Sequence, residues 1–134
     1  MIQLAIETEE DIIVAATFGK SYAREMGFSV VDQTKITVSI SELTRNVINY
    51  GDKGFIMFEK EEHCLKITVQ DEGPGIPDIQ EAMKDGVTTG NGLGLGLSGT
   101  KRLMDEFHIE SKPGKGTKIV IKKWLPCMSE EQDG

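Results

Sequence analysis

A glycine-rich run is the part of the chain best suited to chemistry. Residues 90–101 read GNGLGLGLSGTK, and a helical pattern follows. Glycines have no Cβ, so backbone N–H groups can converge on an anion there, and a helix start adds partial positive charge. A free surface loop is the alternative, but such loops are polar, whereas here Leu93, Leu95 and Leu97 alternate with glycines. The pattern predicts a phosphate-binding loop that closes over its ligand.

Three familiar glycine motifs fit this run poorly. Gly94, Gly96 and Gly99 have the spacing of the dinucleotide fingerprint, but that motif follows a strand directly, and turn-like residues precede it here. The P-loop needs Lys before Ser or Thr, whereas Thr100 precedes Lys101. The kinase glycine loop needs HRD and DFG motifs, which the sequence lacks. Spacing alone therefore predicts phosphate binding without naming a fold.

A polar flank of a predicted helix is the second candidate. Within residues 32–50, Glu42, Asn46 and Asn49 fall together about 120° from the apolar stripe. An amide oxygen suits Mg²⁺, and a carboxylate can act as general base for a hydroxyl. An ordinary solvated helix flank is the alternative.

A turn after a predicted strand is the third candidate. Asp71 begins the sequence DEGPGIP, in which Gly73 and Gly75 allow close backbone approach. A carboxylate there could accept a hydrogen bond from an exocyclic amine such as that of adenine. A tight turn capped by the aspartate is the alternative. Thr117, at the start of the last predicted strand, could reach the same ligand, although threonine is also common in strands.

The elements that must position these groups follow from the apolar periodicity. Strands are predicted at residues 2–7, 55–61, 64–70, 109–111 and 117–124. Helices are predicted at 9–26, 32–50 and 98–107, with a short one at 79–83. Helices and hairpins that do not strictly alternate predict an α+β two-layer sandwich, with a mixed, mostly antiparallel sheet and helices on one face.

Finer helix details are also predicted. Gly27 should end the first helix and Asp32 should cap the second. The expected core stripe of the first helix is Ile13, Ala16, Ala23 and Met26. The expected core stripe of the second helix is Ile36, Ile40, Leu43 and Val47.

Composition bounds the class of protein. The chain has 134 residues, which predicts one domain at residues 1–125 and a disordered acidic tail at 126–134. Its net charge of −7 argues against nucleic-acid binding, and no apolar run is long enough to span a membrane. The N-terminus lacks the basic region of a secretory signal. Cys64 and Cys127 match no metal-ligand spacing, so we expect a reduced, cytoplasmic protein with incidental thiols.

Taken in order, the motifs resemble one family. E-L-x-x-N, D-x-G-x-G-I, G-x-G-L-G-L-G-L and G-T occur in the order found in the GHKL ATPases, which have the Bergerat nucleotide-binding fold and an ATP lid. The resemblance implies ATP and Mg²⁺ as cofactors. Asn46 would bind the Mg²⁺, and Asp71 would contact the adenine amino group. The triphosphate would lie beneath a mobile lid at residues 85–97. The nucleotide-binding residues that the resemblance implies are Asn46, Asn49, Asp71, Gly73, Gly75, Ile76, Gly90, Gly92, Leu93, Gly94, Leu95, Gly96, Leu97 and Thr117.

Within that family, residues 31–37, 41–46, 71–78 and 101–107 resemble the serine/threonine kinases of the bacterial stressosome. This implies a kinase that phosphorylates STAS-domain proteins and, once released from them, activates a PP2C-type phosphatase. Glu42 would accept the proton of the target hydroxyl. Anti-sigma factor kinases share all four motifs, so a protein that binds a sigma factor is the alternative. The catalytic domain of a histidine kinase is a third, less favoured reading.

Overall fold

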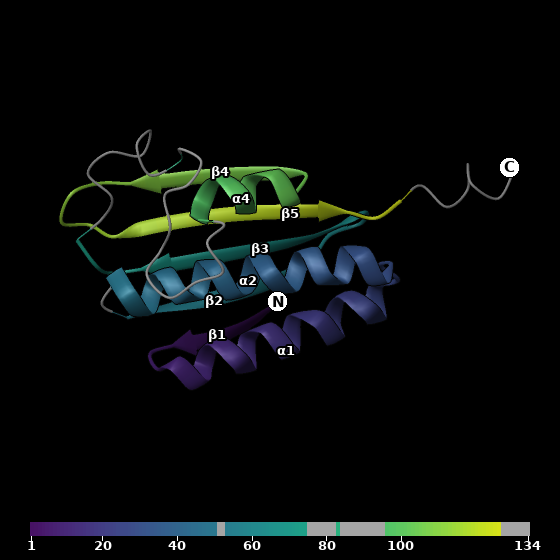
Figure 1. Ribbon diagram of the computed structural model, residues 1–134, viewed down its shortest axis with the longest axis horizontal. Helices are drawn as coiled ribbons and strands as arrows, with labels where there is room; N and C mark the ends of the chain where they lie inside the picture. Colours follow the sequence, from purple (N-terminus) through teal and green to yellow (C-terminus); the bar gives the residue numbers. More distant parts are fainter. Residues whose placement is uncertain (51–52, 75–82, 84–95, 127–134) are drawn as a thin grey trace, which may run out of the picture.

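An antiparallel sheet with helices on one face makes up the described part of the computed structural model, which is residues 1–50, 53–74, 83 and 96–126. The strand order is β1-β2-β3-β5-β4, and all four pairings are antiparallel. The elements in chain order are β1 (Ile2–Ile6), α1 (Glu9–Met26), α2 (Val30–Tyr50), β2 (Gly54–Lys60), β3 (Cys64–Asp71), α4 (Gly96–Leu103), β4 (Glu106–Ser111) and β5 (Thr117–Trp124) (Figure 1). The predicted two-layer α+β architecture is confirmed.

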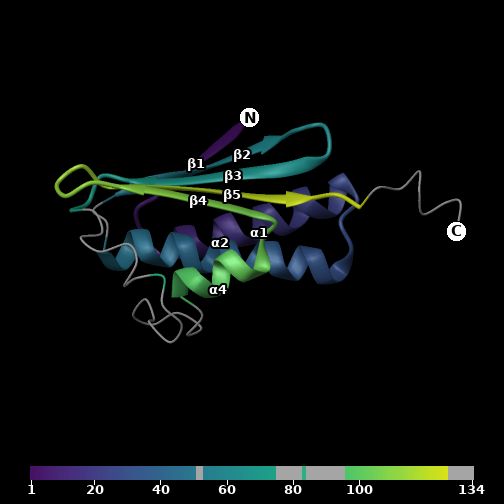
Figure 2. The ribbon, with the colours of Figure 1, turned by 90° about the horizontal axis from the view of Figure 1, so that it is seen from above.

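Alternating residues build the two faces of the sheet. In β5, Thr117, Ile119 and Ile121 are buried, whereas Lys118 between them is exposed. A period of two sends successive side chains to opposite faces. Figure 2 shows α1, α2 and α4 on the same side of the sheet, so the buried set faces the helices and the other face is left open.

The predicted core stripe of α1 is wrong at Ile13, whereas Ala23 is buried and Ala16 and Met26 pack against the core. Ile13 is 67% exposed, and the buried residues are Ile12, Ala15, Gly19 and Ala23. The run IIVAA is apolar on every side, so its local pattern leaves the phase undecided. A Cβ at Gly19 would overlap Cδ1 of Ile40, so a close crossing of α1 and α2 sets the phase. The predicted end of α1 is confirmed, because Gly27 has φ of 100° and its N–H bonds to carbonyls of the last turn.

The start of α2 also differs from the prediction, whereas its core stripe is confirmed. The helix begins at Val30, and the Asp32 N–H donates to Ser29 Oγ at 3.1 Å. Asp32 is therefore inside the first turn and is not the cap. The four predicted core residues of α2 are all at most 1% exposed. The expected short helix at 79–83 and the acidic tail lie outside the described residues, apart from Pro126 and from Met83, which packs against the core.

The third predicted helix is shifted and shorter. α4 runs from Gly96 to Leu103, so Gly96 and Leu97 belong to the helix, and Leu97 is only 3% exposed. Phe107 is a strand residue opposite Ile121. Pairing with β5 therefore overrides the local helical pattern after Leu103.

Candidate functional site

Asp71, Thr117 and the C-terminal end of α2 lie at one end of the molecule. Only residues 51–53 separate the end of α2 from Gly54, and Gly54 lies directly opposite Asp71 in the sheet. Asp71 in turn lies opposite Thr117. In Figure 1 the end of α2, the end of β3 and the starts of β5 and α4 all lie at the left. The connectivity thus brings the C-terminal end of α2 to the strand ends.

The side chains at this end also share one face of the sheet. Val69 and Ile119 lie two residues along their strands from Asp71 and Thr117, and both are buried in the core beneath the helices. Side chains two residues apart point the same way. Asp71 and Thr117 therefore face the helix layer, to which Asn46 of α2 belongs.

The Asp71 carboxylate is held by backbone N–H groups. Its Oδ1 accepts hydrogen bonds from the N–H of Gly73 at 2.9 Å and from the N–H of Thr117 at 3.3 Å. The first of these is the capped turn that the alternative interpretation requires. Among the described residues no hydrogen bond uses Oδ2. The turn therefore occupies one oxygen and leaves the other for a ligand.

A pair of hydroxyls lies beside this carboxylate. Ser111 Oγ donates to the Gly116 carbonyl oxygen at 3.1 Å and lies 2.9 Å from Thr117 Oγ1. Gly116 has φ of 84°, and a Cβ there would overlap the Asp71 carbonyl oxygen. Both constraints require glycine at this position. Ser111 was not among the predicted site residues, because the sequence shows it only as the end of a short strand.

A hollow of about 190 Å³ adjoins the same residues. Its lining includes Asp71, Ser111 and Thr117, and also Gln70, Glu110 and Lys118, which alternate with them along the strands. The hollow therefore lies at the rim of the sheet, and Thr117 itself is only 7% exposed.

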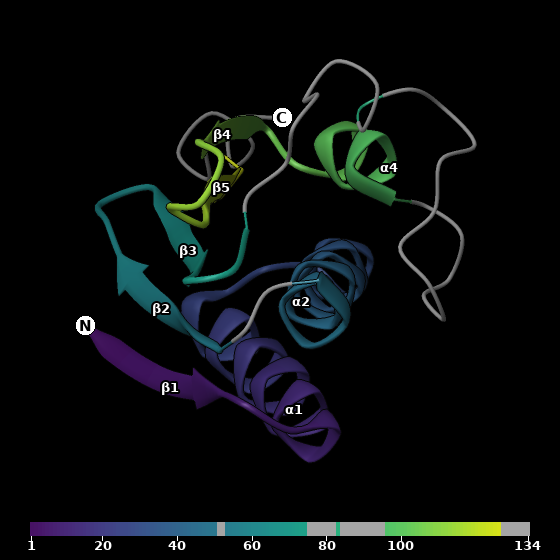
Figure 3. The same cartoon turned by 90° about the vertical axis from the view of Figure 1, so that its left-hand side faces the viewer.

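The predicted flank of α2 changes from buried to exposed along its length. Glu42 is 1% exposed, Asn46 is half-buried and Asn49 is exposed. α2 lies between α1 and α4 (Figure 3), and both helices contact it. The alternative interpretation, an ordinary solvated helix flank, does not explain a buried carboxylate, so it is wrong for Glu42. One turn earlier, the buried Ser39 hydroxyl has no hydrogen-bond partner within the part of the chain that the structure describes.

The remaining predicted residues divide into two groups. Gly73 is buried beside Asp71, while Gly96 and Leu97 open α4, whose N-terminus lies at the site end of the molecule. Leu97 packs its side chain into the core. The predicted residues that lie outside the described part of the chain are Gly75, Ile76, Gly90, Gly92, Leu93, Gly94 and Leu95. Most of the predicted lid, residues 85–95, lies outside it as well.

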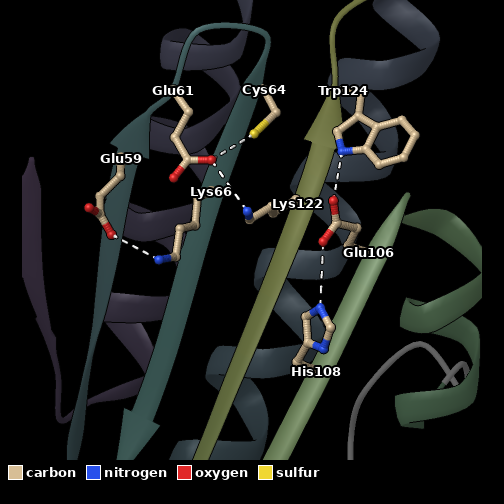
Figure 4. Close-up of polar contacts among 8 residues, drawn as sticks. All are labelled: Glu59, Glu61, Cys64, Lys66, Glu106, His108, Lys122 and Trp124. Atoms are coloured by element: carbon tan, nitrogen blue, oxygen red, sulfur yellow. Dashed lines mark hydrogen bonds and ion pairs between the residues drawn. The ribbon is translucent and has the colours of Figure 1, made fainter.

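The open face of the sheet holds a different kind of polar contact (Figure 4). Glu61 Oε1 accepts a hydrogen bond from Cys64 Sγ at 3.1 Å and lies 3.4 Å from Lys122 Nζ. Burial, and then the Glu61 hydrogen bond, raise the pKa of the Cys64 thiol to about 11. The thiol is neutral at pH 7 and is a poor nucleophile. No cluster of three His, Cys, Asp or Glu side chains occurs in the described ranges, so this face offers no metal site there.

Figure 4 also shows two further polar contacts on this face. Lys66 Nζ and Glu59 Oε1 form an ion pair at 3.9 Å, and His108 Nε2 lies 3.5 Å from Glu106 Oε1. None of the helices in the described ranges is both long and apolar enough to cross a membrane.

Sequence comparisons fit this geometry. Residues 31–127 match the family of histidine kinase-, DNA gyrase B- and HSP90-like ATPases. The chain is 51% identical to serine/threonine-protein kinase RsbT of Bacillus subtilis, over 90% of this chain and 93% of that protein. It is 34% identical to the anti-sigma F factor of Clostridium acetobutylicum, over 77% of this chain and 78% of that protein.

Solved structures show the same fold. The RsbU and RsbW domains of a Mycobacterium tuberculosis protein match 93% of this chain, and 33% of their own chain, with a TM-score of 0.65 and 18% identity. The catalytic domain of the histidine kinase ThkA matches 92% of this chain, and 96% of its own, with a TM-score of 0.58 and 18% identity.

Proposed function

This chain belongs to the family of histidine kinase-, DNA gyrase B- and HSP90-like ATPases, and from that premise we propose that it is an ATP-dependent serine/threonine protein kinase of a bacterial partner switch. The 51% identity to RsbT extends over nearly the whole of that kinase, which supports a shared activity. One structural observation carries the proposal. Asp71 and Thr117 lie directly opposite each other in the sheet, at the end of the molecule where α2 also ends, and Glu42 and Asn46 belong to that helix.

The nucleotide would lie between the strand ends and α2. Asp71 and Thr117 would receive the adenine, and the N-terminus of α4 would face the phosphates with its partial positive charge. The backbone of the glycine-rich run, which includes Gly90, Gly92 and Gly94, would complete the triphosphate site. The predicted contacts of Asn49, Gly73, Gly75, Ile76, Leu93, Leu95, Gly96 and Leu97 are part of the same proposal.

The donor set on α2 fits a magnesium ion. Asn46 offers one neutral oxygen, and Mg²⁺ in phosphoryl-transfer sites takes only one or two protein ligands because phosphates and water supply the others. When bound, Mg²⁺ neutralises charge on the phosphates during transfer. Asn46 would hold and orient it.

Glu42 would act as the general base. As the target hydroxyl oxygen bonds to the γ-phosphorus and the bond to ADP breaks, the Glu42 carboxylate would take the hydroxyl proton. Burial of Glu42 suits this role, because a charge in a low-dielectric site acts more strongly on a nearby proton than one in water.

The proposed substrates are STAS-domain proteins of the RsbS and RsbR type in the cytoplasm. After release from them, the chain would bind and activate a PP2C-type phosphatase related to RsbU. No nucleic-acid or membrane partner is proposed. The alternative function is an anti-sigma factor that binds a sigma factor and phosphorylates its antagonist. The relatives that favour it are the anti-sigma F factors, of which that of Bacillus licheniformis is 35% identical over 69% of this chain and 69% of that protein.

Phosphotransfer tests the proposal directly. With γ-labelled ATP and Mg²⁺, label should appear on serine or threonine of a STAS-domain protein. Glu42→Gln should abolish transfer while ATP still binds, and Glu59→Gln on the open face should leave transfer unchanged. Full transfer by Glu42→Gln would remove Glu42 from the mechanism. Stable capture of a sigma factor, with no label on STAS-domain proteins, would favour the alternative.

A further inference from the structure

We propose that Ser111 sets the base selectivity of the nucleotide site by fixing the direction of the Thr117 hydroxyl. The inference rests on the proposed function, in which a nucleotide base lies at Asp71 and Thr117. Ser111 would hold Thr117 as a hydrogen-bond acceptor. Two acceptors, Thr117 and Asp71, would then face the base and select a purine that carries a 6-amino group over one that carries a 6-oxo group.

The direction of the hydroxyl pair follows from the proton count. A serine hydroxyl has one proton, and Ser111 Oγ donates it to the Gly116 carbonyl oxygen at 3.1 Å. A carbonyl oxygen can only accept, so this bond has one direction. In the 2.9 Å contact between Ser111 Oγ and Thr117 Oγ1, the donor must then be Thr117. The lone pairs of Thr117 Oγ1 are left for a ligand.

The backbone holds this arrangement in place. Ser111 and Thr117 lie directly opposite each other in the β4–β5 ladder, so their side chains share one face. The Gly116 carbonyl oxygen also accepts the Lys112 N–H at 3.4 Å, which closes the turn around it. A residue with a Cβ cannot replace Gly116 without meeting the Asp71 carbonyl oxygen. The acceptor that orients Ser111 is therefore fixed by the same turn that places Thr117.

Asp71 supplies the second acceptor. Two backbone N–H groups bond its Oδ1, and one of them belongs to Thr117 itself. This ties the carboxylate to the residue that carries the hydroxyl. An ionised carboxylate has no proton to donate, so Oδ2 can only accept. The site thus offers Oδ2 of Asp71 and Oγ1 of Thr117 as acceptors, from residues directly opposite each other in the sheet.

Two adjacent acceptors match an amino group and oppose a carbonyl. An amino group has two protons to donate, whereas a 6-oxo group would direct its lone pairs at two acceptors and leave all of them unpaired. Sites built this way discriminate strongly, because the wrong ligand leaves buried polar groups without partners. If Ser111 lost its oxygen, the Thr117 hydroxyl could turn and donate to the 6-oxo group.

Nucleotide affinities measured by calorimetry test this inference. ATP and inosine triphosphate, each with Mg²⁺, serve as probes: they differ at the 6-position and at N1, which is an acceptor in adenine and a donor in hypoxanthine, so the ratio reports this edge of the base as a whole. The parent chain should prefer ATP, and Ser111→Ala should lower the ratio of the two affinities about tenfold, equivalent to one hydrogen bond. Ser111→Thr, which keeps the hydroxyl, should retain the ratio. Ser21→Ala makes the same change in α1 and should leave the ratio unchanged.

A double-mutant cycle separates positioning from a structural effect. In a Thr117→Val background the ratio should already be low, and adding Ser111→Ala should not lower it further. If Ser111→Ala does not fold, Ser111→Cys, whose thiol hydrogen-bonds weakly, should give the same loss.

Two results would overturn the inference alone. One is an unchanged ratio in folded, ATP-binding Ser111→Ala. The other is an equal drop in the Thr117→Val background. Failure of the parent chain to bind ATP would instead overturn the proposed function, and this inference with it.

Discussion

Strand β5 begins and ends in polar surroundings of opposite kinds. At its start, Thr117 lies beside Asp71, whose bonds within the described chain come from backbone N–H groups. At its end, Lys123 Nζ lies 3.8 Å from Asp32 Oδ1 and 3.5 Å from Asp105 Oδ2, and the Trp124 N–H donates to Asp105 Oδ2 at 2.7 Å. One end leaves a carboxylate oxygen for a ligand, and the other end pairs its charges with one another.

The two ends of β5 therefore have different roles in the molecule. The Lys123 cluster joins the first turn of α2, the turn after α4 and the end of β5, so it ties the two layers together at the end far from the site. Because that end is tied, the opposite end can keep polar groups open to a ligand. The site end should therefore respond to changes mainly in binding, and the tied end mainly in stability.

Gly116→Ala should have the largest effect, because it changes the backbone that positions Asp71 and Thr117. The variant forces a Cβ into the left-handed region and against the Asp71 carbonyl oxygen. We expect the free energy of unfolding to fall by about 3 kcal/mol or more, with loss of ATP binding. Gly114→Ala is the matched control, since Gly114 has φ of 77° but open space around it. Urea denaturation that gave equal losses for both variants would contradict the role of the close approach.

Asp71→Asn should weaken binding and spare stability. Asparagine can keep the two backbone hydrogen bonds through its oxygen, and its NH₂ group would then face the amino group of adenine. We expect ATP affinity to fall about 100-fold, with the melting temperature nearly unchanged. Calorimetry measures the first and differential scanning fluorimetry the second. Glu72→Gln alters the exposed neighbouring charge and should change neither.

Lys123→Met should have the opposite effect to Asp71→Asn: it should lower stability and spare ATP binding. Lys123 is 7% exposed, and its removal leaves two partly buried carboxylates close together. We expect a loss of about 2 kcal/mol in the free energy of unfolding, with ATP affinity within about twofold of the parent. Lys118→Met, an exposed position on the same strand, controls for loss of charge. A large loss of ATP affinity in Lys123→Met, with stability retained, would break the comparison between the two ends.

Asp11→Ala should have the smallest effect. Its Oδ2 accepts the N–H groups of Glu7 at 2.8 Å and Thr8 at 3.0 Å, and these bonds lower the pKa of Asp11. A lowered folded-state pKa gives stability that is present above the unfolded value of 3.8 and lost as the pH falls through the folded value. We expect the melting temperature to drop about 4 °C at pH 7 and by less at pH 2.

The control for this last prediction is Glu10→Ala, which removes a first-turn charge without touching those two N–H groups. Asp11 resembles Asp71 in being bonded by backbone N–H groups, but no site prediction involves it. An equal melting-temperature deficit for Asp11→Ala at both pH values would show that these bonds carry no pH-dependent stability.

Much of the fold could be predicted, because it rests on local patterns. The four core residues of α2 recur at helical spacing, and most of the residues between them are polar. The end of α1 follows from a glycine in the left-handed region. The predicted placement of Asp71 at a strand end is confirmed, because a β-type run stops there at a turn sequence. The placement of Ile13 in the core stripe of α1 was wrong, because the run around it is apolar on every side.

Local sequence alone determined which groups are predicted to bind a nucleotide, since residue type and the end of a strand or helix are read within a few residues. Only the tertiary structure decided which of them meet. The pairing of Ser111 with Thr117 depends on the register of β4 against β5, and a slip of one residue would turn Ser111 to the open face. Register is set by the turn at Gly116 and by burial across the whole sheet, and no short stretch of sequence encodes it.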